Sequence, residues 1–351
     1  MRSWLAASLM ILTTVGVIAA QSPREYERIQ TSRIVGVAIT DLSSPKNVAE
    51  FADLSSTALP LKFRLSRRPL TGPLPAPTYE NRQTVKASAP NGTTYEGWSG
   101  RYSDGKVYPG RGENSTNANP RQRYALHHGY AFNPADVFIG RREGPKIRTL
   151  LFFRDVGSHE TAPYHFTVDS RGLVNLIVSD VNISDNNELN VYALVGDPAS
   201  GKWLAGTMLD RRGFTSWSHP WSGSSGETVH FLWNWGDATF DRTNQAMGLF
   251  YVDRSSNGYG KKIRIVDGLV ESYGAAIDSG SGNLMIAARV GEEVYVAMRK
   301  ADSTWLKPTR LNSAIATMMY DLSLTSTGNG SFVVRGSGSK VSEWVIRPGP
   351  N

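Results

Sequence analysis

The chain of 351 residues contains no cysteine. Disulfide scaffolds, thiolate metal sites, cysteine nucleophiles and iron–sulfur clusters are therefore all excluded. Helical periodicity is also weak along nearly the whole sequence, and a single short stretch, Asn47–Leu54, is a candidate helix. What the chain does have is 40% hydrophobic residues, with 9 Trp, 14 Tyr and 12 Phe. This composition is sufficient for a large core and excludes a disordered chain.

The first twenty residues have the pattern of a targeting segment. Met1-Arg2 supplies a positive charge, and the stretch Trp4–Ala20 is almost wholly apolar and ends in two small residues. This pattern is typical of a secretory signal peptide. A membrane anchor is the alternative, because the apolar stretch reaches the lower limit for spanning a bilayer. No basic stop-transfer cluster follows, so we expect cleavage, a secreted or periplasmic protein, and no stable membrane insertion afterwards.

The balance of charge is basic, with a formal net charge of +7. A basic surface favours an acidic partner, which can be nucleic acid, anionic lipid or polyanionic polysaccharide. Export argues against nucleic acid. The expected partner is therefore an acidic polysaccharide or glycan, bound by a monomer.

From Pro163 onward the chain repeats one order of events four times. Each copy has a short β-like run, a turn with a glycine, a second apolar run, and then further strands joined by polar turns. The turn glycines are 54, 56 and 48 residues apart, at Gly172, Gly226, Gly282 and Gly330. Four short strands in about fifty residues is the spacing of a β-propeller blade. A β-sandwich would not repeat this order.

We therefore expect an all-β protein, a β-propeller of six or seven four-stranded blades. Asp136–Arg142 and Arg148–Phe153 are typical of the outer half of an earlier blade. The predicted organisation is a signal peptide over residues 1–20 and a single propeller domain over residues 21–351. Its blade repeats are clear over residues 160–351 and degenerate over residues 21–159.

Two turns resemble a known hairpin motif. Asp197–Trp203 and Ala301–Trp305 resemble degenerate Asp-boxes, and His159–Pro163 with Arg171-Gly172 resembles the opening of a blade in BNR-repeat proteins. The chain thus resembles the BNR/Asp-box (sialidase-like) β-propeller superfamily, which includes propeller polysaccharide lyases. The resemblance implies that the Asp holds the turn backbone and that the Trp packs between blades. It covers residues 155–350 well and residues 21–135 hardly at all.

The chain departs from the sialidases within that superfamily. Arg33-Ile34-Val35 lacks the proline of the sialidase Arg-Ile-Pro signature. The three arginines, the Tyr–Glu pair and the acid Asp of a sialidase site cannot be assigned either. Sialidase activity is therefore not expected.

The innermost strand of each predicted blade begins with an aromatic residue. These residues are Tyr164, Trp217, Tyr273 and Tyr320. A ring of aromatics at a channel mouth can stack against sugar rings, whereas the same residues can also be wedges between blades. Both interpretations stay open on the sequence alone.

Histidine is scarce, and two of the six residues fall on the same predicted strands. His165 and His219 can act as acid or base near neutral pH, whereas His230 lies in an apolar run as a hydrogen-bonded core residue. The predicted catalytic residues are His165, His219, Tyr164 and Tyr273. The predicted substrate-binding residues are Trp217, Tyr320, Asp321, Arg289, His128 and Tyr130.

Two reactions fit such a set. β-Elimination of a uronate needs a group that neutralises the carboxylate, a base and an acid, which Arg, His and Tyr supply. Hydrolysis needs two carboxyl groups. Asp169 and Asp278 follow their strands directly, where a structural turn role is expected, whereas Glu160, Glu271 and Asp321 stay possible acids. A non-catalytic glycan- or protein-binding propeller, or a structural envelope protein, is the alternative. Unlike residues at the second position of the inner strand favour a single site: His165, Ser218, Gly274 and Asp321.

No cofactor or metal is predicted. The oxygen spacing of Asp180 and Asn182 opens like a calcium loop, but Asp185 and Val191 stand where glycine and glutamate are needed. The basic clusters are predicted to be solvated faces or outer-strand positions, and one of them is Arg64, Arg67 and Arg68.

Overall fold

The protein is described by a computed structural model, in which every described element is a β-strand. The described residues are 39–42, 52–54, 58–68, 84–103, 106–109, 136–143, 146–153, 164–182, 188–212, 220–235, 247–311, 321–337 and 342–349. Within them, no helix has the length and apolar character needed to cross a membrane. The expected signal peptide lies outside the described residues.

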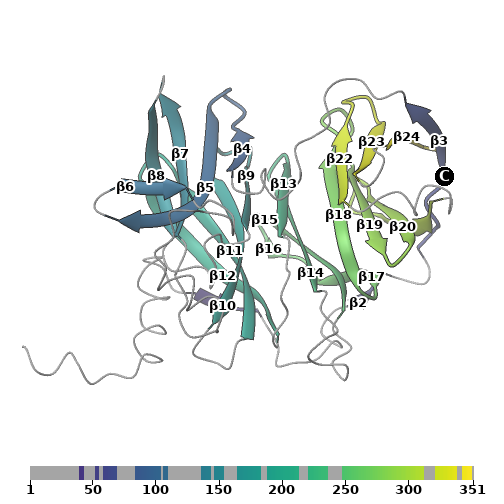
Figure 1. Ribbon diagram of the computed structural model, residues 1–351, viewed down its shortest axis with the longest axis horizontal. Helices are drawn as coiled ribbons and strands as arrows, with labels where there is room; N and C mark the ends of the chain where they lie inside the picture. Colours follow the sequence, from purple (N-terminus) through teal and green to yellow (C-terminus); the bar gives the residue numbers. More distant parts are fainter. Residues whose placement is uncertain are drawn as a thin grey trace, which may run out of the picture.

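The strands form five sheets, and the innermost strand of each sheet is followed outward by its neighbours (Figure 1). The first blade contains β4 (Thr84–Ser88), β5 (Thr94–Ser103), β7 (Asp136–Glu143) and β8 (Lys146–Phe153), with β6 (Lys106–Pro109) paired to β5. The second contains β9 (Tyr164–Val168), β10 (Val174–Asn182), β11 (Glu188–Asp197) and β12 (Lys202–Arg212). The third contains β13 (Trp221–Ser225), β14 (Thr228–Trp235), β15 (Gly248–Ser255) and β17 (Ile263–Asp267), with β16 (Gly258–Tyr259) paired to β15.

The last two blades complete the series. The fourth contains β18 (Val270–Ile277), β19 (Leu284–Val290), β20 (Glu293–Arg299) and β21 (Trp305–Arg310). The fifth contains β22 (Asp321–Ser326), β23 (Phe332–Ser337), β24 (Ser342–Pro348) and, as its outermost strand, β3 (Phe63–Arg68). The innermost strands contact one another in the order β4, β9, β13, β18, β22. The molecule is a β-propeller, as the repeats predict.

The fifth blade is completed by the N-terminal part of the chain. The fourth sequence repeat supplies only β22, β23 and β24, and β3 pairs antiparallel with β24 as the fourth strand. Upstream of β3, the described segments pair with the outer edges of the second, third and fourth blades in turn. Here β1 (Ile39–Asp41) pairs parallel with β12, β2 (Ala52–Asp53) pairs parallel with β17, and Pro60 bridges to Lys307. We call β1, β2, Pro60 and β3 the N-terminal belt.

The belt explains why the described residues form five blades, a number close to the six or seven expected. Within residues 21–159, where degenerate blades were predicted, the described strands form one blade and the belt. Ala52–Asp53, at the end of the candidate helix, is the strand β2, and residues 47–51 lie outside the described residues. A belt of this kind covers the edge strands, whose unpaired backbone groups would otherwise be open to pairing with other chains.

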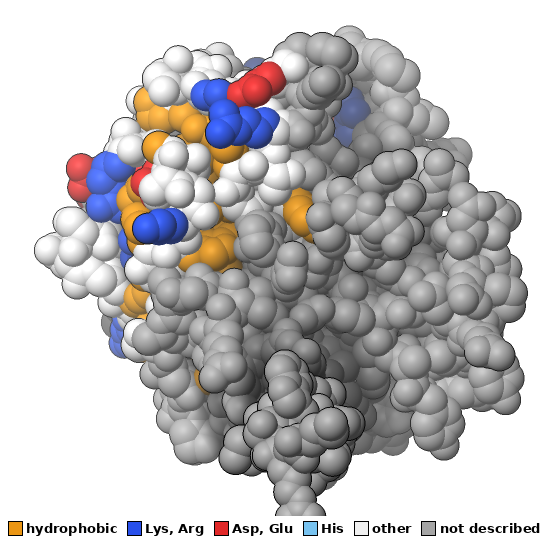
Figure 2. All heavy atoms as spheres, turned by 90° about the vertical axis from the view of Figure 1, so that its left-hand side faces the viewer, with side chains coloured by type: hydrophobic (Ala, Val, Ile, Leu, Met, Phe, Trp, Pro, Cys, Tyr) orange, Lys and Arg blue, Asp and Glu red, His pale blue; other side chains and the backbone are white. Residues whose placement is uncertain are grey.

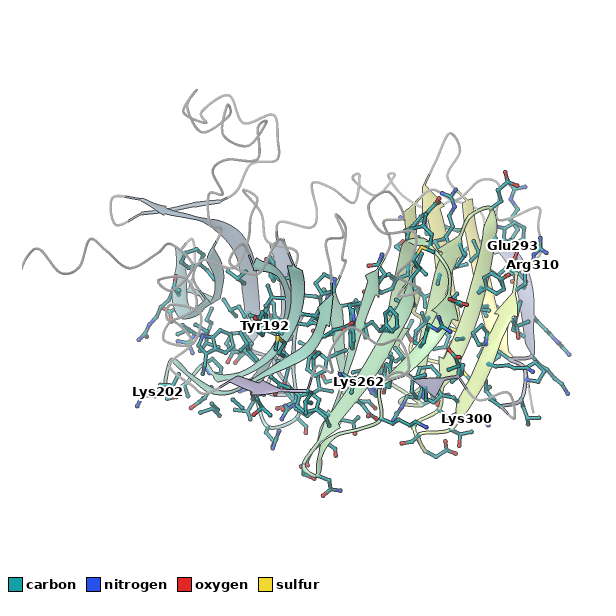
Figure 3. All side chains as sticks on the ribbon, turned by 90° about the horizontal axis from the view of Figure 1, so that it is seen from below. Tyr192, Lys202, Lys262, Glu293, Lys300 and Arg310 are labelled. Atoms are coloured by element: carbon teal, nitrogen blue, oxygen red, sulfur yellow. The ribbon has the colours of Figure 1, made fainter. Side chains whose placement is uncertain are left out.

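Side chains of the third blade hold the belt in place. Lys262 Nζ donates to the Leu42 carbonyl oxygen at 2.5 Å, and Arg264 Nε donates to Asp53 Oδ1 at 2.7 Å. In Figure 3, Lys262 lies between Tyr192 of the second blade and Lys300 of the fourth blade. On the fourth blade, Glu293 and Arg310 form an ion pair of 2.8 Å across β20 and β21 (Figure 3).

One inner strand begins later than the sequence predicts. The repeat places the strand at Trp217–Trp221, whereas β13 spans Trp221–Ser225. Pro220 lies between the two positions, and because proline has no N–H to donate to a ladder, the strand begins after it. Trp221, and not Trp217, therefore has the strand position of Tyr164 and Tyr273. Trp217 lies outside the described residues.

Adjacent blades pack closely at the inner strands. A Cβ at Gly274 of β18 would lie 2.7 Å from the backbone nitrogen of Leu324 in β22, so only glycine fits there. Small hydroxyl side chains join the other inner strands: Ser224 Oγ in β13 donates to the Val168 carbonyl oxygen of β9 at 2.9 Å. The inner strands thus contact each other through backbone and short polar groups.

The two turns that resemble Asp-boxes hold their backbone as the resemblance implies. Asp197 Oδ1 accepts the Ala199 N–H at 2.9 Å, and Asp302 Oδ1 accepts the Thr304 N–H at 2.9 Å. Trp203 is buried in a core that includes Leu151 of the preceding blade. Trp305 packs edge-on against Tyr251 of the preceding blade, with ring centroids 4.9 Å apart.

Candidate functional site

The predicted site residues that the structure describes belong to one end of the propeller. The connections between blades, and those between second and third strands, lie at the end of each sheet where the innermost strand begins. We call this end the connection face, and the opposite end the hairpin face. Tyr164, His165, Tyr273, Asp321 and Arg289 lie on strands at the connection face. The other predicted residues lie outside the described residues: His219, Trp217, Tyr320, His128 and Tyr130.

Both described tyrosines reach across to the preceding blade. Tyr164 is 5% exposed, and its hydroxyl hydrogen-bonds to the backbone of Val85 in β4. Burial raises the pKa of Tyr164 above its usual value. Tyr273 Oη donates to the Leu232 carbonyl oxygen in β14 at 3.3 Å. These contacts fit the interpretation of the two tyrosines as wedges between blades. Their catalytic role stays a prediction.

His165 joins the inner strands of two blades. Its Nδ1 accepts the backbone N–H of Ser222 in β13 at 3.1 Å, and its ring stacks on Trp221 with centroids 5.9 Å apart. Burial lowers the pKa of His165 to about 4, so the ring is neutral at pH 7. Because Nδ1 is an acceptor, the single proton of the neutral ring is on Nε2. His165 can therefore donate a hydrogen bond at Nε2, but it lacks a free basic nitrogen.

His230 is a core residue, as predicted. It is 1% exposed, its Nδ1 lies 2.8 Å from Tyr251 Oη, and its ring stacks on the ring of Tyr251. Burial lowers its pKa to about 3. Its Nε2 is buried without a hydrogen-bond partner among the described residues.

Arg289 already has a carboxylate partner. Its guanidinium lies 3.1 Å from Glu271 Oε2, and its Nε donates to the Gly291 carbonyl oxygen at 2.8 Å. Glu271 lies on β18, the strand next to Arg289 in the same sheet. The carboxylate that was expected to come from a ligand is thus supplied by the protein.

The two aspartates that follow inner strands hold turns, as predicted. Asp169 Oδ1 accepts the N–H groups of Arg171 and Leu173, each at 3.0 Å. Asp278 Oδ2 accepts the N–H of Ser281, and its Oδ1 accepts the hydroxyl of Ser326 in the next blade at 2.6 Å. Hydrogen bonds from Ser326 and Ser281 outweigh the desolvation of this buried carboxylate and lower the pKa of Asp278 to about 2.

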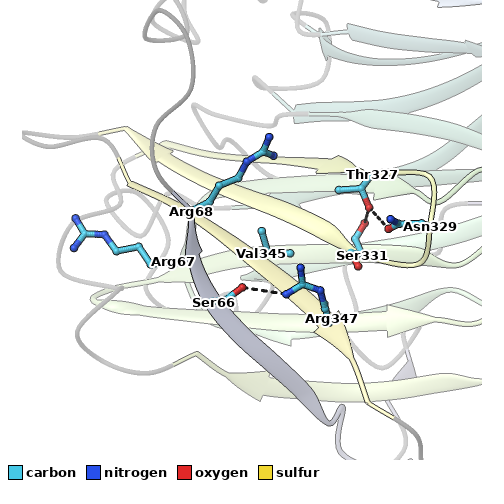
Figure 4. Close-up of a pocket in the computed structure, with 8 residues that line it drawn as sticks. All are labelled: Ser66, Arg67, Arg68, Thr327, Asn329, Ser331, Val345 and Arg347. Atoms are coloured by element: carbon cyan, nitrogen blue, oxygen red, sulfur yellow. Dashed lines mark hydrogen bonds between the residues drawn. The ribbon is translucent and has the colours of Figure 1, made fainter.

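A different site lies on the fifth blade, along β3 and beside the turn between β22 and β23. A pocket of about 370 Å³ lies there between the belt and the last blade, and Figure 4 shows its lining. The lining residues come from β3, from the turn between β22 and β23, and from β24: Ser66, Arg67, Arg68, Thr327, Asn329, Ser331, Val345 and Arg347. We call this pocket the arginine groove.

The arginine groove has positive charge without counter-charge. Arg67, Arg68 and Arg347 are exposed, and within the described part of the chain none of them forms an ion pair. Arg68 lies opposite Glu343 in the strand pairing, but Arg335 already binds that carboxylate. The described side of the first blade differs, because there basic side chains lie beside acidic ones (Figure 2), as in the Arg141–Glu143 pair of 2.5 Å.

Polar side chains complete the groove. Arg347 Nη1 donates to Ser66 Oγ at 3.1 Å, which holds the guanidinium over β3 (Figure 4). Thr327 Oγ1 donates to Asn329 Oδ1 at 2.5 Å, so the amide nitrogen of Asn329 is left to donate to a ligand. The groove thus offers guanidinium, hydroxyl and amide donors, and no carboxylate lines it.

The sequence alone predicts a solvated face for Arg64, Arg67 and Arg68. The groove was missed because Arg347, the third arginine of its lining, lies about 280 residues further along the chain. The sequence feature that could have indicated the groove is the density of arginine in one short strand.

Comparison with known proteins identifies no family. No family model matches the chain, and no curated protein sequence does. Solved structures that resemble it do so at 7–12% identity, and their descriptions include a propeller, an arabinofuranosidase, a lectin, a peptidase and a protein of unknown function. The Dos1 propeller has a TM-score of 0.43, with 84% of this chain and 76% of that chain covered.

Two further solved structures are complexes with sugars. The α-L-arabinofuranosidase of Fusarium graminearum with arabinobiose has a TM-score of 0.40, 11% identity, and 84% of this chain and 79% of that chain covered. The SapL1 lectin with α-methyl fucoside has a TM-score of 0.39, 12% identity, and 76% and 94% covered. At these scores the likenesses carry no argument about the function of this chain.

Proposed function

We propose that this protein is an exported β-propeller that binds an acidic polysaccharide or glycan in the arginine groove. The observation that carries the proposal is the set of exposed arginines without acidic partners that line one pocket. Guanidinium groups bind carboxylate and sulfate oxygens through paired hydrogen bonds. The net charge of +7 adds a long-range attraction for a polyanion.

The other lining groups support a sugar as the carrier of the negative charge. Ser66, Thr327, Asn329 and Ser331 place hydroxyl and amide groups next to the arginines. Such groups suit the many hydroxyls of a glycan, which need both donors and acceptors. An acidic glycan therefore fits the groove with its charges and its neutral hydroxyls together.

The described residues favour binding without catalysis. Elimination needs a base near the sugar, and the neutral His165 has its acceptor nitrogen engaged by Ser222. Hydrolysis needs a pair of carboxyl groups, whereas the groove lining contains none. A lyase-like or glycosidase activity stays as the alternative, and it would have to use the predicted residues of the connection face.

Isothermal titration calorimetry with polygalacturonate tests the proposal. We expect binding that weakens as salt is added, since mobile ions screen exposed charges, and no binding to neutral dextran. The variant Arg68→Gln/Arg347→Gln should lose at least about tenfold in affinity. The control Arg148→Gln/Lys202→Gln removes the same charge from exposed positions outside the groove. It should bind polygalacturonate with the affinity of wild type.

The same samples distinguish binding from turnover. Unsaturated products of elimination absorb in the ultraviolet, and new reducing ends report hydrolysis. We expect neither signal from wild type. Equal affinity of the groove variant and its control for polygalacturonate would contradict the proposed site, and turnover abolished by His165→Ala would support the alternative.

A further inference from the structure

The outermost strand of the fifth blade has a row of arginines on one face. In a strand, alternate residues share a face, so Arg64, Ser66 and Arg68 of β3 lie on the same side. The pairing register places Arg64 opposite Arg347 and Ser66 opposite Val345. Phe63 and Leu65 face the other way, where they pack against the core between the fourth and fifth blades.

The pair Arg64–Arg347 is unfavourable by itself. Directly opposite residues of an antiparallel pair have Cβ atoms about 5 Å apart, and like charges there destabilise the sheet. Both arginines are exposed, and neither has an ion pair within the described part of the chain. An anion bound between them would remove the repulsion.

The row also has a defined length. Arg64 and Arg68 are four residues apart, which is about 13 Å along a strand. Arg347 donates to Ser66 Oγ at 3.1 Å, so its charge lies over the middle of the row. Three positive charges thus follow one line along β3.

We infer that the groove takes a linear polyanion laid along β3, with at least three consecutive charged sugar units. This inference rests on the proposed function and adds to it the form of the ligand. A single anion or a disaccharide would contact only part of the row, and a branched glycan would not follow it. On the other side of the ligand, the turn of Thr327, Asn329 and Ser331 offers its polar groups to the sugar hydroxyls.

A chain-length series tests this inference. Galacturonic acid and its linear oligomers of two, three, four and six units are titrated into the protein, with neutral malto-oligosaccharides as controls. We expect no measurable binding of the monomer, a rise of at least about tenfold in affinity from the dimer to the tetramer, and little change from the tetramer to the hexamer.

The variant Arg64→Gln separates the row from the pocket. It should lower the affinity for the hexamer about tenfold and leave the affinity for the dimer within about twofold. Arg148→Gln, an exposed arginine on β8, is the charge-matched control, and thermal melts confirm that both variants fold.

The outcomes are distinguishable. No binding by any oligomer or by the polymer would contradict the proposed function itself. Equal affinity for monomer and hexamer, or an Arg64→Gln variant that binds the hexamer like wild type, would overturn the linear row while the proposed function stands. Tighter binding of a single-stranded DNA oligonucleotide than of the hexamer would overturn the choice of a glycan.

Discussion

At the scale of single residues, the partly buried His165 and the buried His230 make the stability of the protein depend on pH. Burial lowers the pKa of His165 to about 4 and that of His230 to about 3, whereas an unfolded histidine has a pKa of about 6.5. Both bind a proton more weakly in the folded chain, so acid favours the unfolded chain. We expect full stability above pH 6.5 and a loss of up to about 1.4 kcal/mol per pH unit per histidine below it.

Urea denaturation at pH 7, 6 and 5 measures this dependence. The window of loss extends from pH 6.5 down to about 4 for His165 and to about 3 for His230. The variant His165→Gln should have a shallower fall than wild type between pH 6.5 and 5. A wild-type stability that is flat over this range would contradict the burial of the two rings.

A second prediction at this scale concerns Gly274, where the inner strands of two blades approach closely. A Cβ at Gly274 would lie 2.7 Å from a backbone nitrogen of the next blade, and backbone cannot move aside easily. We expect Gly274→Ala to destabilise the protein by about 1–3 kcal/mol. Gly349→Ala is the control, because its Cβ would meet no atom closer than 3.6 Å, and the two variants should differ clearly in denaturant midpoint.

At the scale of elements, turns that look alike in sequence differ in what they hold. Asp278 is 0% exposed and bonds both its own turn and Ser326 of the next blade, whereas Asp197 bonds only backbone and side-chain groups of its own exposed turn. Hydrogen bonds to a charged group contribute about 1.5–3 kcal/mol. We expect Asp278→Ala to lower the free energy of unfolding by at least about 2 kcal/mol, and Asp197→Ala to lower it by about 1 kcal/mol.

The stability difference between wild type and Asp278→Ala should also depend on pH, because it comes from a carboxylate that must be charged. Hydrogen bonds lower the pKa of Asp278 to about 2, so its stabilisation is present above an unfolded pKa of about 3.9 and is lost as the pH falls towards 2. The gap between wild type and Asp278→Ala should therefore narrow between pH 4 and 2. A constant gap would show that the carboxylate charge plays no part.

Elements built from neighbouring residues could be predicted from the sequence. Each blade hairpin has its glycine and polar turn within a few residues of its strands, so the repeat of Gly172, Gly226 and Gly282 is enough to find the blades. The inner strand at Trp221 was misplaced because the aromatic pattern fits Trp217 equally well, and Pro220 decides between them.

Elements that depend on distant pairing could not be predicted. The strands β1 and β2 have three and two residues, too short for any periodicity, and they pair with strands more than 160 residues away. The arginine groove could not be predicted for the same reason, since its two walls meet only once β3 pairs with β24. The site residues predicted from the sequence rest on local pattern alone, and half of them lie outside the described residues.

At the scale of the whole molecule, the pairing of β3 with β24 ties the N-terminal belt to the last blade. The chain has no cysteine, so a single engineered pair tests this closure cleanly. Ser66 and Val345 lie directly opposite each other, at a Cβ separation near that of a disulfide. We expect Ser66→Cys/Val345→Cys to form an intramolecular disulfide that raises stability by up to about 5 kcal/mol.

Thermal melts with and without reductant measure the gain, and a non-reducing gel shows where the bond forms. Reductant should return the variant to near the wild-type melting temperature. Disulfide-linked dimers in place of a cross-link within the chain would contradict the pairing of β3 with β24. Ligands of the groove contact both strands, so an oligomer that binds should likewise raise the melting temperature of wild type.

The central claim is that an acidic glycan binds along β3 of the fifth blade, in the arginine groove. A crystal structure of the protein with a linear hexagalacturonate tests it most directly. The account predicts electron density for the sugar along β3, with carboxylates on Arg68 and Arg347 and hydroxyls near Asn329. Density for the hexamer at the connection face, beside Tyr164 and Tyr273, with the groove empty, would contradict it.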